Sequence, residues 1–444
     1  MRFGLVTTSV VAAAYFAGCE FTKGVGPGDG GPDGPPDAGK CAGSSLECVG
    51  DMLRSCSMAG ADAVDTACGW GCVPGADPHC GTIKPAGGND DPAMGVTAMD
   101  LDPTDLKNVT LGNGVTIDGD DGQIGTSGSA NMFHSGNEGL ENGIDFRFRG
   151  PISIFRFKSL TINGTVTLVG GRPIALVVDG PVTIGGTVEA TGLCSSSLAG
   201  PGGFNGGASQ HLAGLPTVGG GSGAATSTTG GGGGGHGSIG GAGDGAAGGV
   251  AFGDSMITVL AGGGGGGAGG CGNNNCDGGG GGGALQIVSN TRITVQSGGI
   301  NAGGCGGKPG TGGGDSGGGG GAGGTILLEA PEVIVAGTLA ANGGGGGGGG
   351  GSTATAGGNA ALGTTGGSAG GGDGNNEQGG SGAGTGVAAG SGGNGTNPGG
   401  GGGALGRIRI NTKGGNGAQL QQSMLSPGPN DPGMLFSSGS ATTQ

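Results

Sequence analysis

Long glycine tracts constrain this sequence more than any other feature. Glycine fills 132 of the 444 positions, with uninterrupted runs such as 343–351. Such runs break the strict Gly-X-Y period that a collagen triple helix requires. The segments 262–283 and 303–324 contain no Leu, Ile, Val or Phe, which excludes one uniform apolar core along the chain. Charged residues are only 11% of the chain, unlike a charged disordered protein. The sequence therefore predicts a mosaic of strand-forming blocks and glycine tracts.

The strand-forming blocks repeat. Three segments of about 20 residues each hold three short pieces in which apolar residues recur at i and i+2, the period of a β-strand. Turn-type residues such as Asp179-Gly180-Pro181 separate the pieces. The segments are 174–192, 285–304 and 326–343, with a partial copy at 405–410 and less regular blocks at 109–117 and 152–168. Three strands per repeat predict an all-β fold, a parallel β-helix over 106–413.

Glycine-rich insertions follow the third piece of each repeat and end before the first piece of the next. They cover 193–283, 305–324 and 344–403, so all of them are expected to leave the β-helix at one corner. Two possibilities remain open for their structure. Glycine loses the most entropy on ordering, which favours flexible loops. Alternatively, tracts without side chains pack closely as hydrogen-bonded helices of the polyproline II type.

The N-terminal region resembles a bacterial lipoprotein signal. An apolar run from Leu5 to Phe16 is too short to span a bilayer and suits a signal peptide over residues 1–18. It leads into Ala17-Gly18-Cys19, a lipobox-like sequence in which the thiol of Cys19 would receive lipid. A plain secretory signal is the alternative. With lipid on Cys19 as the membrane anchor, residues 19–40, rich in Gly, Pro and Asp, would form an extended tether.

A cysteine-rich segment over residues 41–80 follows the tether. So short an exported segment is expected to depend on disulfide bonds, and the sequence does not select their pairing. Zinc binding through Cys68, Cys72 and His79 is the alternative. Cys271 and Cys276 are a further candidate pair, and Cys194 with Cys305 is a guess. The six candidates within the segment are Cys41, Cys48, Cys56, Cys68, Cys72 and Cys80. Residues 81–105 are interpreted as a linker and 414–444 as a C-terminal tail.

Taken together, the lipobox, the Cys-rich segment and repeats such as 172–178 resemble the glycine-rich, lipid-anchored surface proteins of Gram-negative bacteria, especially gliding predatory ones. The resemblance covers essentially the whole chain. It implies a compartment, the outer membrane or cell surface, and an architecture. No catalytic residue carries over from it.

Candidate catalytic and ligand-binding residues are sparse. Asp120-Asp121, Gly235-His236-Gly237 and Arg407-Ile408-Arg409 follow the order of a pectin-hydrolase pattern, but the Asn-Thr-Asp element is missing. Asp118-Gly119-Asp120-Asp121 is a weak calcium candidate, with a charged turn as the simpler interpretation. No Lys or Arg lies between Arg172 and Arg292, which disfavours nucleic acid as a partner. No catalytic residue, cofactor or bound metal is predicted.

These observations favour a non-enzymatic surface lipoprotein with a structural or adhesive role, presenting a glycine-rich face from a β-helix. Its expected partners are the membrane, through the N-terminal lipid, and surface glycans or other surface proteins. Two alternatives stay open. One is a polysaccharide hydrolase or lyase built on a β-helix, and the other is a module that binds ice or crystalline glycan.

Overall fold

The structure is a computed structural model of the whole chain, and it describes residues 41–86, 95–126, 132–208, 229–271, 276–364, 366–367, 369–372, 377–421 and 424–444. These residues are all-β, with several parallel and mixed sheets, two short 3-10 helices and no α-helix. Contacts divide the chain into two compact units. The smaller unit is Met1–Ser45 with Ser55–Val64, and the larger is Leu46–Arg54 with Asp65–Gln444.

The N-terminal cysteine-rich segment contains disulfide bonds, as predicted. Cys41 bonds Cys56 within the smaller unit, and two further bonds, Cys48–Cys72 and Cys68–Cys80, lie in the larger unit. The strands are short, with one three-stranded sheet of order β1-β2-β3 and one β4–β5 pair. Their bounds are β1 Ser45–Val49, β2 Met52–Cys56, β3 Val64–Ala67, β4 Cys72–Val73 and β5 His79–Cys80. With so few buried apolar residues, these crosslinks supply stability that packing cannot.

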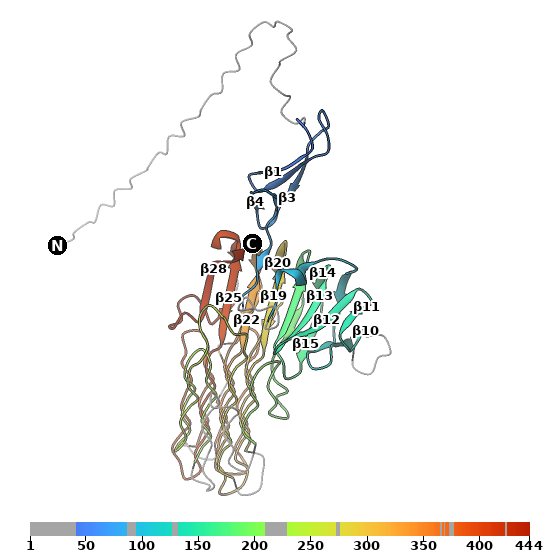
Figure 1. Cartoon of the computed structure of the whole chain (residues 1–444). Helices are drawn as coiled ribbons and strands as arrows, with labels where there is room; N and C mark the ends of the chain where they lie inside the picture. Colours follow the sequence, from blue (N-terminus) through green and yellow to red (C-terminus); the bar gives the residue numbers. More distant parts are fainter. Residues whose placement is uncertain are drawn as a thin grey trace, which may run out of the picture. The chain divides into compact units, whose positions relative to one another are not determined.

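Three long sheets contain most of the strands of the larger unit (Figure 1). Sheet A has the order β11-β12-β13-β16-β19-β22-β25-β28, sheet B β10-β9-β8-β15-β18-β21-β24-β27, and sheet C β26-β23-β20-β17-β14-β7. The strands of sheet A are β11 Gly139–Glu141, β12 Ile144–Arg149, β13 Ile152–Phe157, β16 Ile174–Val178, β19 Ala284–Ser289, β22 Thr325–Glu329, β25 Arg407–Thr412 and β28 Phe436–Ser440. Those of sheet B are β8 Val115–Asp118, β9 Gln123–Thr126, β10 Met132–Ser135, β15 Thr165–Val169, β18 Thr187–Glu189, β21 Gly299–Asn301, β24 Thr338–Ala340 and β27 Met424–Ser426. Those of sheet C are β7 Asn108–Leu111, β14 Ser159–Ile162, β17 Val182–Ile184, β20 Arg292–Val295, β23 Glu332–Val335 and β26 Ala418–Leu420.

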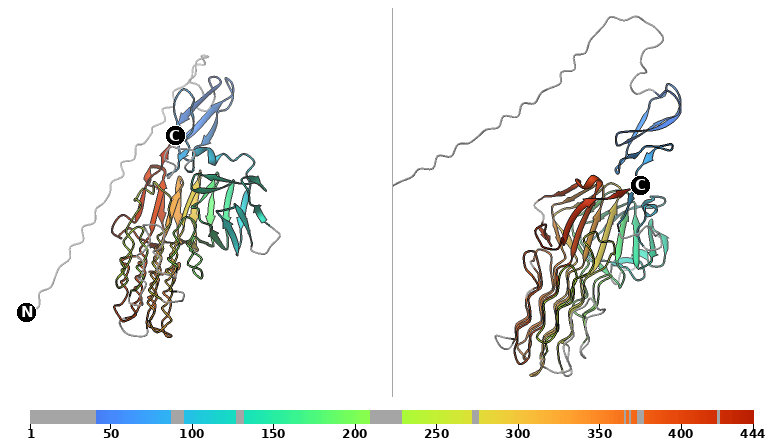
Figure 2. Two further views of the ribbon diagram at one scale, coloured as in Figure 1. Left: turned by 60° about the horizontal axis from the view of Figure 1, so that its bottom comes forward. Right: turned by 60° about the vertical axis from the view of Figure 1, so that its left-hand side comes forward.

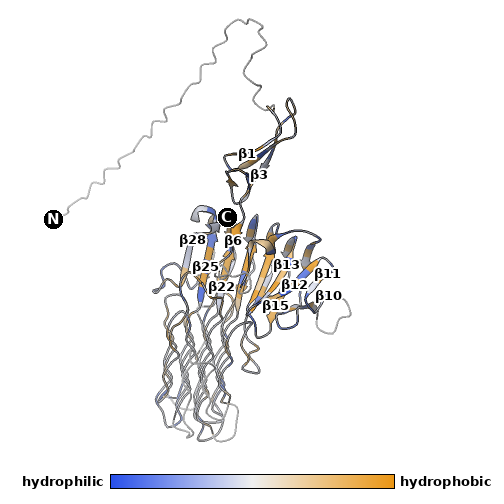
Figure 3. Cartoon of the chain, in the orientation of Figure 1, coloured by the Kyte–Doolittle hydropathy of each residue, from blue (hydrophilic) through white to orange (hydrophobic). Residues whose placement is uncertain are grey.

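From β16 onward the chain visits sheets A, C and B in a fixed order. Each strand pairs in parallel with the strand of the same sheet one pass earlier: Val182 lies beside Leu160, and Ile293 beside Val182. Antiparallel strands occur at one edge of two sheets: β9 and β10 extend sheet B beyond β8, and β11 and β12 extend sheet A beyond β13. Alternate residues of all three sheets point into one shared apolar core, which contains fully buried Leu160, Val182 and Ile293. Figure 3 shows this concentration of apolar residues in the strands.

All three glycine-rich insertions lie at the same place in the repeat, as the sequence predicts. Each lies between a strand of sheet B and the next strand of sheet A: between β18 and β19, β21 and β22, and β24 and β25. Because β18, β21 and β24 are neighbours in sheet B, the insertions start side by side. Figures 1 and 2 show their described parts running together, away from the ends of the strands.

Two segments differ from their predicted descriptions as linker and tail. The segment interpreted as a linker contains β6 Ile83–Lys84 and the 3-10 helix η1 Ala98–Leu101, and Ile83, Val96 and Leu101 are buried in a second apolar cluster with sheet A residues such as Val177. The predicted tail supplies β26, β27 and β28, the last strand of each sheet, after the 3-10 helix η2 Lys413–Gly415. It ends in β29 Thr442–Thr443, which pairs with β6. These strands contain few apolar residues, so their sequence lacks the apolar alternation that would predict a strand.

Candidate functional site

The glycine tracts are joined by backbone hydrogen bonds that repeat every three residues. In the tract 317–324, the amides of residues 317, 320 and 323 donate to carbonyl oxygens of 398, 401 and 404, all at 2.9 Å. The amides of residues 318, 321 and 324 donate to the carbonyl oxygens of 308, 305 and 302. The amides of 319 and 322 donate to the carbonyl oxygens of 267 and 264. Three residues is the repeat of a polyproline II helix, which has no internal hydrogen bonds and must satisfy its amides with neighbours. Of the two predicted possibilities, the described tracts therefore follow the packed one.

The carbonyl oxygens of the same tract face three further neighbours. Residues 317 and 320 accept from 231 and 234, residues 318 and 321 accept from 347 and 344, and residues 319 and 322 accept from 279 and 282. The tract therefore has six tracts around it, three that receive its amide protons and three that donate to its carbonyls. All eight of its residues are buried. We call the assembled tracts the glycine bundle, comprising the described residues of 199–208, 229–252, 261–283, 302–324, 341–372 and 377–406.

At many glycines of the bundle the neighbouring tract lies too close for any side chain. A Cβ placed on Gly320 would lie 2.1 Å from the carbonyl oxygen of Gly344, and one on Gly403 would lie 1.9 Å from that of Gly321. Observed Cβ contacts do not fall below 3.0 Å. The obstacle is backbone on both sides, which cannot rotate away as a side chain can. Glycine is therefore required at these positions by the close approach of the tracts.

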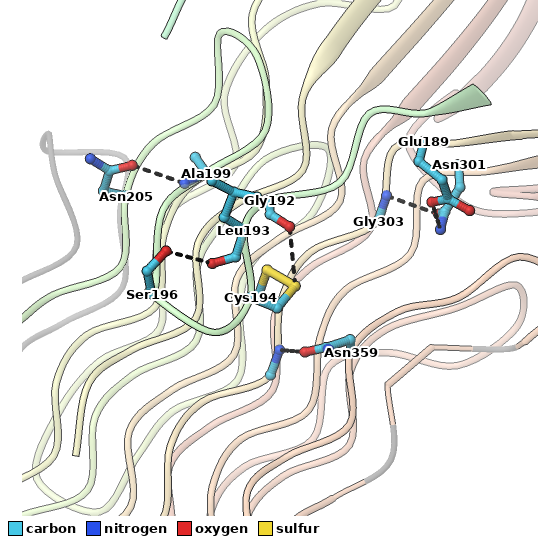
Figure 4. The surroundings of a disulfide bond; sticks show 12 residues. Glu189, Gly192, Leu193, Cys194, Ser196, Ala199, Asn205, Asn301, Gly303 and Asn359 are labelled. Carbon is cyan, nitrogen blue, oxygen red and sulfur yellow. Dashed lines mark hydrogen bonds between the residues drawn. A yellow bond between two sulfur atoms is a disulfide. The ribbon is translucent and has the colours of Figure 1, made fainter. Parts of the chain in front are cut away.

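A disulfide bond between Cys194 and Cys305 crosslinks two of the insertions near their start (Figure 4). The sulfur of Cys194 also lies 3.4 Å from the carbonyl oxygen of Gly192. Cys305 belongs to one of the tracts that surround 317–324, because its carbonyl oxygen accepts the amide of Gly321. This crosslink spans 111 residues of sequence and holds the first and second insertions together.

His236 lies fully inside the structure, where the glycine bundle meets sheet A. Its Nδ1 is 2.7 Å from the carbonyl oxygen of Gly323, and its ring packs against Phe252 with 4.7 Å between ring centroids. Burial, with a smaller contribution from the Arg407 charge, lowers the pKa of His236 to about 4. The imidazole is therefore neutral at pH 7, and its contacts are with Gly323 and Phe252.

The three parts of the pectin-hydrolase pattern lie in two different surroundings. Arg407 is near His236 and donates to the carbonyl oxygen of Phe252 at 3.2 Å. Asp120 instead lines two surface pockets of about 260 and 400 Å³, and Asp121 lines the larger one. Neither pocket is lined by His236 or Arg407. The structure thus brings together the His and Arg elements and places the Asp pair elsewhere.

The carboxylates of the calcium candidate are engaged by backbone amides. Asp118 accepts from the amide of Asp120 at 2.8 Å, Asp120 accepts from Gly171 at 2.9 Å, and Asp121 accepts from Gln123 at 3.0 Å. Burial, together with the charges of Asp121 and Asp120, raises the pKa of Asp118. These contacts tie a turn together. Within the part of the chain that the structure describes, no group of three His, Cys, Asp or Glu side chains is arranged to hold a metal ion.

A column of threonines crosses the outer face of sheet C, a feature that was not predicted from the sequence. Thr110, Thr161, Thr183 and Thr294 are direct partners on adjacent parallel strands. They alternate with the inward apolar residues and are exposed or half-buried. Adjacent strands are about 4.8 Å apart, so the column presents hydroxyl and methyl groups at that interval. Residues far apart in the sequence meet here, which only the strand register reveals.

The remaining predicted site residues have different outcomes. Cys19 lies outside the described residues. Cys271 and Cys276, a predicted disulfide pair, are both buried, and a hydrogen bond joins their thiols; their disulfide bond stays a prediction. This hydrogen bond, together with burial, raises the pKa of Cys276. In the described ranges, no helix has the length and apolar character needed to cross a bilayer.

In comparisons with known proteins, no protein-family model, no curated protein and no solved structure matches this chain.

Proposed function

We propose that this chain is a non-enzymatic, lipid-anchored protein of the outer membrane or cell surface, with a structural or adhesive role. In this proposal the three sheets form a parallel β-helix, whose passes through sheets A, C and B are its turns. The insertions stack on one corner of the β-helix as the glycine bundle.

The observation that carries the proposal is the tract 317–324 with six hydrogen-bonded neighbours. The tract 317–324 consists of Gly and Ala alone, so it carries no side chain for acid–base, nucleophilic or metal chemistry. The bundle offers a rigid body, because its buried amides are tied to neighbouring tracts. Such a body is suited to hold apart or present the surfaces at its ends.

Membrane attachment is tested with the full chain expressed in a Gram-negative host. Detergent phase partitioning and membrane fractionation should place the wild-type protein with the membrane, and Cys19→Ala should move it to the soluble fraction. Cys194→Ser is the matched control, since it changes a cysteine in the glycine-rich insertions and should leave attachment unchanged. Membrane attachment that survives Cys19→Ala would refute the lipid anchor.

Surface exposure and adhesion require a second test. Antibody labelling of intact cells should detect the protein, and cells carrying it should attach to a glycan-coated or bare surface more than cells without it. Equal attachment by both strains would remove the adhesive role and leave the structural one.

A second candidate function, recognition of a periodic surface such as ice or crystalline glycan, is favoured by the threonine column of sheet C. The only ion pair on that face among the described residues joins Arg292 to Glu332 at 2.7 Å. The two charges of this pair cancel, although the whole chain has a net charge of −15. An uncharged lattice would meet no electrostatic repulsion there.

This candidate is tested by sedimentation with crystalline cellulose or chitin and by thermal hysteresis. Thr183→Lys should abolish either activity, because it places a charge in the middle of the column. Thr311→Lys, an exposed substitution in the glycine-rich insertions, is the control. Absence of both activities in the wild-type protein would reject the candidate.

A further inference from the structure

Cys271 and Cys276 stand at the facing ends of two neighbouring glycine tracts. The first tract donates from the amides of residues 263, 266 and 269 to the carbonyl oxygens of 282, 279 and 276, at 2.8–2.9 Å. These bonds step three residues forward in one tract and three residues back in the other. The two tracts are therefore antiparallel neighbours that stay together up to the cysteines.

The two thiols face each other in a buried position. Cys271 is 5% exposed and Cys276 is not exposed, and a side-chain hydrogen bond joins them. The neighbouring Asp277 is held by Lys308 at 2.7 Å, and the amide of Lys308 donates to the Asp277 carbonyl oxygen. The start of the second tract is thus fixed on a third one, which keeps Cys276 beside Cys271.

We propose that Cys271 and Cys276 are oxidised to a disulfide bond that links these two tract ends, in addition to the four disulfides among the described residues. The bond would join two tracts that are already paired, so it adds a crosslink without rearranging them. Glycine tracts lose an unusually large entropy on ordering. A crosslink lowers the conformational entropy of the unfolded chain, so less entropy is lost when the tracts become ordered. Together with Cys194–Cys305, the bond would restrain the bundle at two separate places.

The oxidation needs a disulfide as the electron acceptor, either a small-molecule disulfide or that of a thiol–disulfide oxidoreductase. Cys271 is partly accessible and Cys276 is not, so the first attack is assigned to Cys271. The Cys271 thiolate attacks one sulfur of the oxidant, forms a mixed disulfide and releases one thiol. The Cys276 thiolate then attacks the Cys271 sulfur and releases the second thiol. The protein loses two electrons and two protons, and the oxidant gains them.

The test is thiol mapping of the full-length protein after incubation with glutathione disulfide. The protein is denatured without reductant, alkylated with iodoacetamide, digested and analysed by mass spectrometry. The peptide that contains both cysteines is expected unalkylated, lighter than its dithiol form by two hydrogen atoms. Recovery of that peptide with two alkylated cysteines, under conditions that oxidise Cys194 and Cys305, would overturn the proposal.

Hydrogen exchange tests the restraint separately. Amides of 263–270 and 277–282 are expected to exchange at least tenfold more slowly in the oxidised protein than in the Cys271→Ser/Cys276→Ser double variant. Reduced wild-type protein should match the variant, which controls for the substitution itself. Equal exchange in the oxidised protein and the variant would refute the restraining role.

Discussion

The amide nitrogen of Gly320 donates a 2.9 Å hydrogen bond to the carbonyl oxygen of Gly401, 81 residues later in the sequence. Equivalent bonds three residues before and after it hold the same pair of tracts together. The spacing of these tracts is set by backbone-to-backbone contact, with no side chain between them. Any added side chain must therefore push the tracts apart.

Replacing Gly320 with Ala should destabilise the protein by about 3 kcal/mol, the upper end of the usual cost of overpacking. The new Cβ would lie 2.1 Å from the Gly344 carbonyl oxygen, and neither tract can move without breaking bonds to its other neighbours. Chemical or thermal unfolding followed by circular dichroism measures the loss. Gly313→Ala is the matched control, because that exposed glycine has no atom within 4 Å of where the alanine Cβ would lie and should be nearly neutral.

Removing the Cys194–Cys305 disulfide should loosen the bundle while the sheets stay folded. The bond spans 111 residues, for which loop-closure entropy gives about 5 kcal/mol. The apolar core of the three sheets contains neither cysteine. Cys194→Ser/Cys305→Ser should therefore lower the unfolding midpoint and speed amide exchange in 199–208 and 303–308. An unchanged midpoint and unchanged exchange would show that the crosslink restrains nothing.

Lowering the pH should destabilise the protein through His236. Its pKa is about 4 in the folded state and near 6.5 when exposed, so the unfolded chain binds the proton more tightly. The stability is fully present above pH 6.5 and falls as the pH drops toward 4, by about 3 kcal/mol in total. Denaturant unfolding of wild type and His236→Gln across this range isolates the contribution, since the carboxylates titrate in both. Parallel stability curves for the two proteins would contradict the buried neutral imidazole.

Raising the pH should destabilise the protein through Glu329. Burial raises the pKa of this carboxyl, while Asn411, the Ala86 amide, Gln286 and the Arg409 charge act in the opposite direction. A raised pKa favours the protonated folded form, so its contribution is complete at low pH and is lost as the pH rises through the folded pKa. Glu329→Gln should remove this loss and become relatively more stable toward neutral pH. A wild-type curve as flat as that of the variant would show that the carboxyl is ionised in the fold.

The strands could be predicted from sequence because alternation leaves a signal in single segments. Val182 and Ile184 flank Thr183, and the structure places the valine and the isoleucine in the core and the threonine outside. The common corner of the insertions followed from where each glycine tract begins. By contrast, β27 was missed because Met424 and Leu425 give almost no alternation before the turn that follows.

The glycine bundle could be only half predicted. A glycine tract has no side-chain pattern, so nothing in the sequence says that Gly320 pairs with Gly401 rather than with a glycine one residue away. That register is fixed by the strands at the base of the tracts, where Thr325 pairs with Arg407. The burial of His236 could not be predicted either, because its ring packs against Phe252, which lies 16 residues away in the sequence.

Hydrogen exchange of the tract 317–324 in the full-length protein tests the central claim most directly. If the tract is surrounded by six hydrogen-bonded neighbours, its amides should exchange as slowly as those of β19 and β22 in the core sheets. Exchange of the tract at the rate of an unfolded glycine chain, with β19 and β22 still protected, would contradict the glycine bundle.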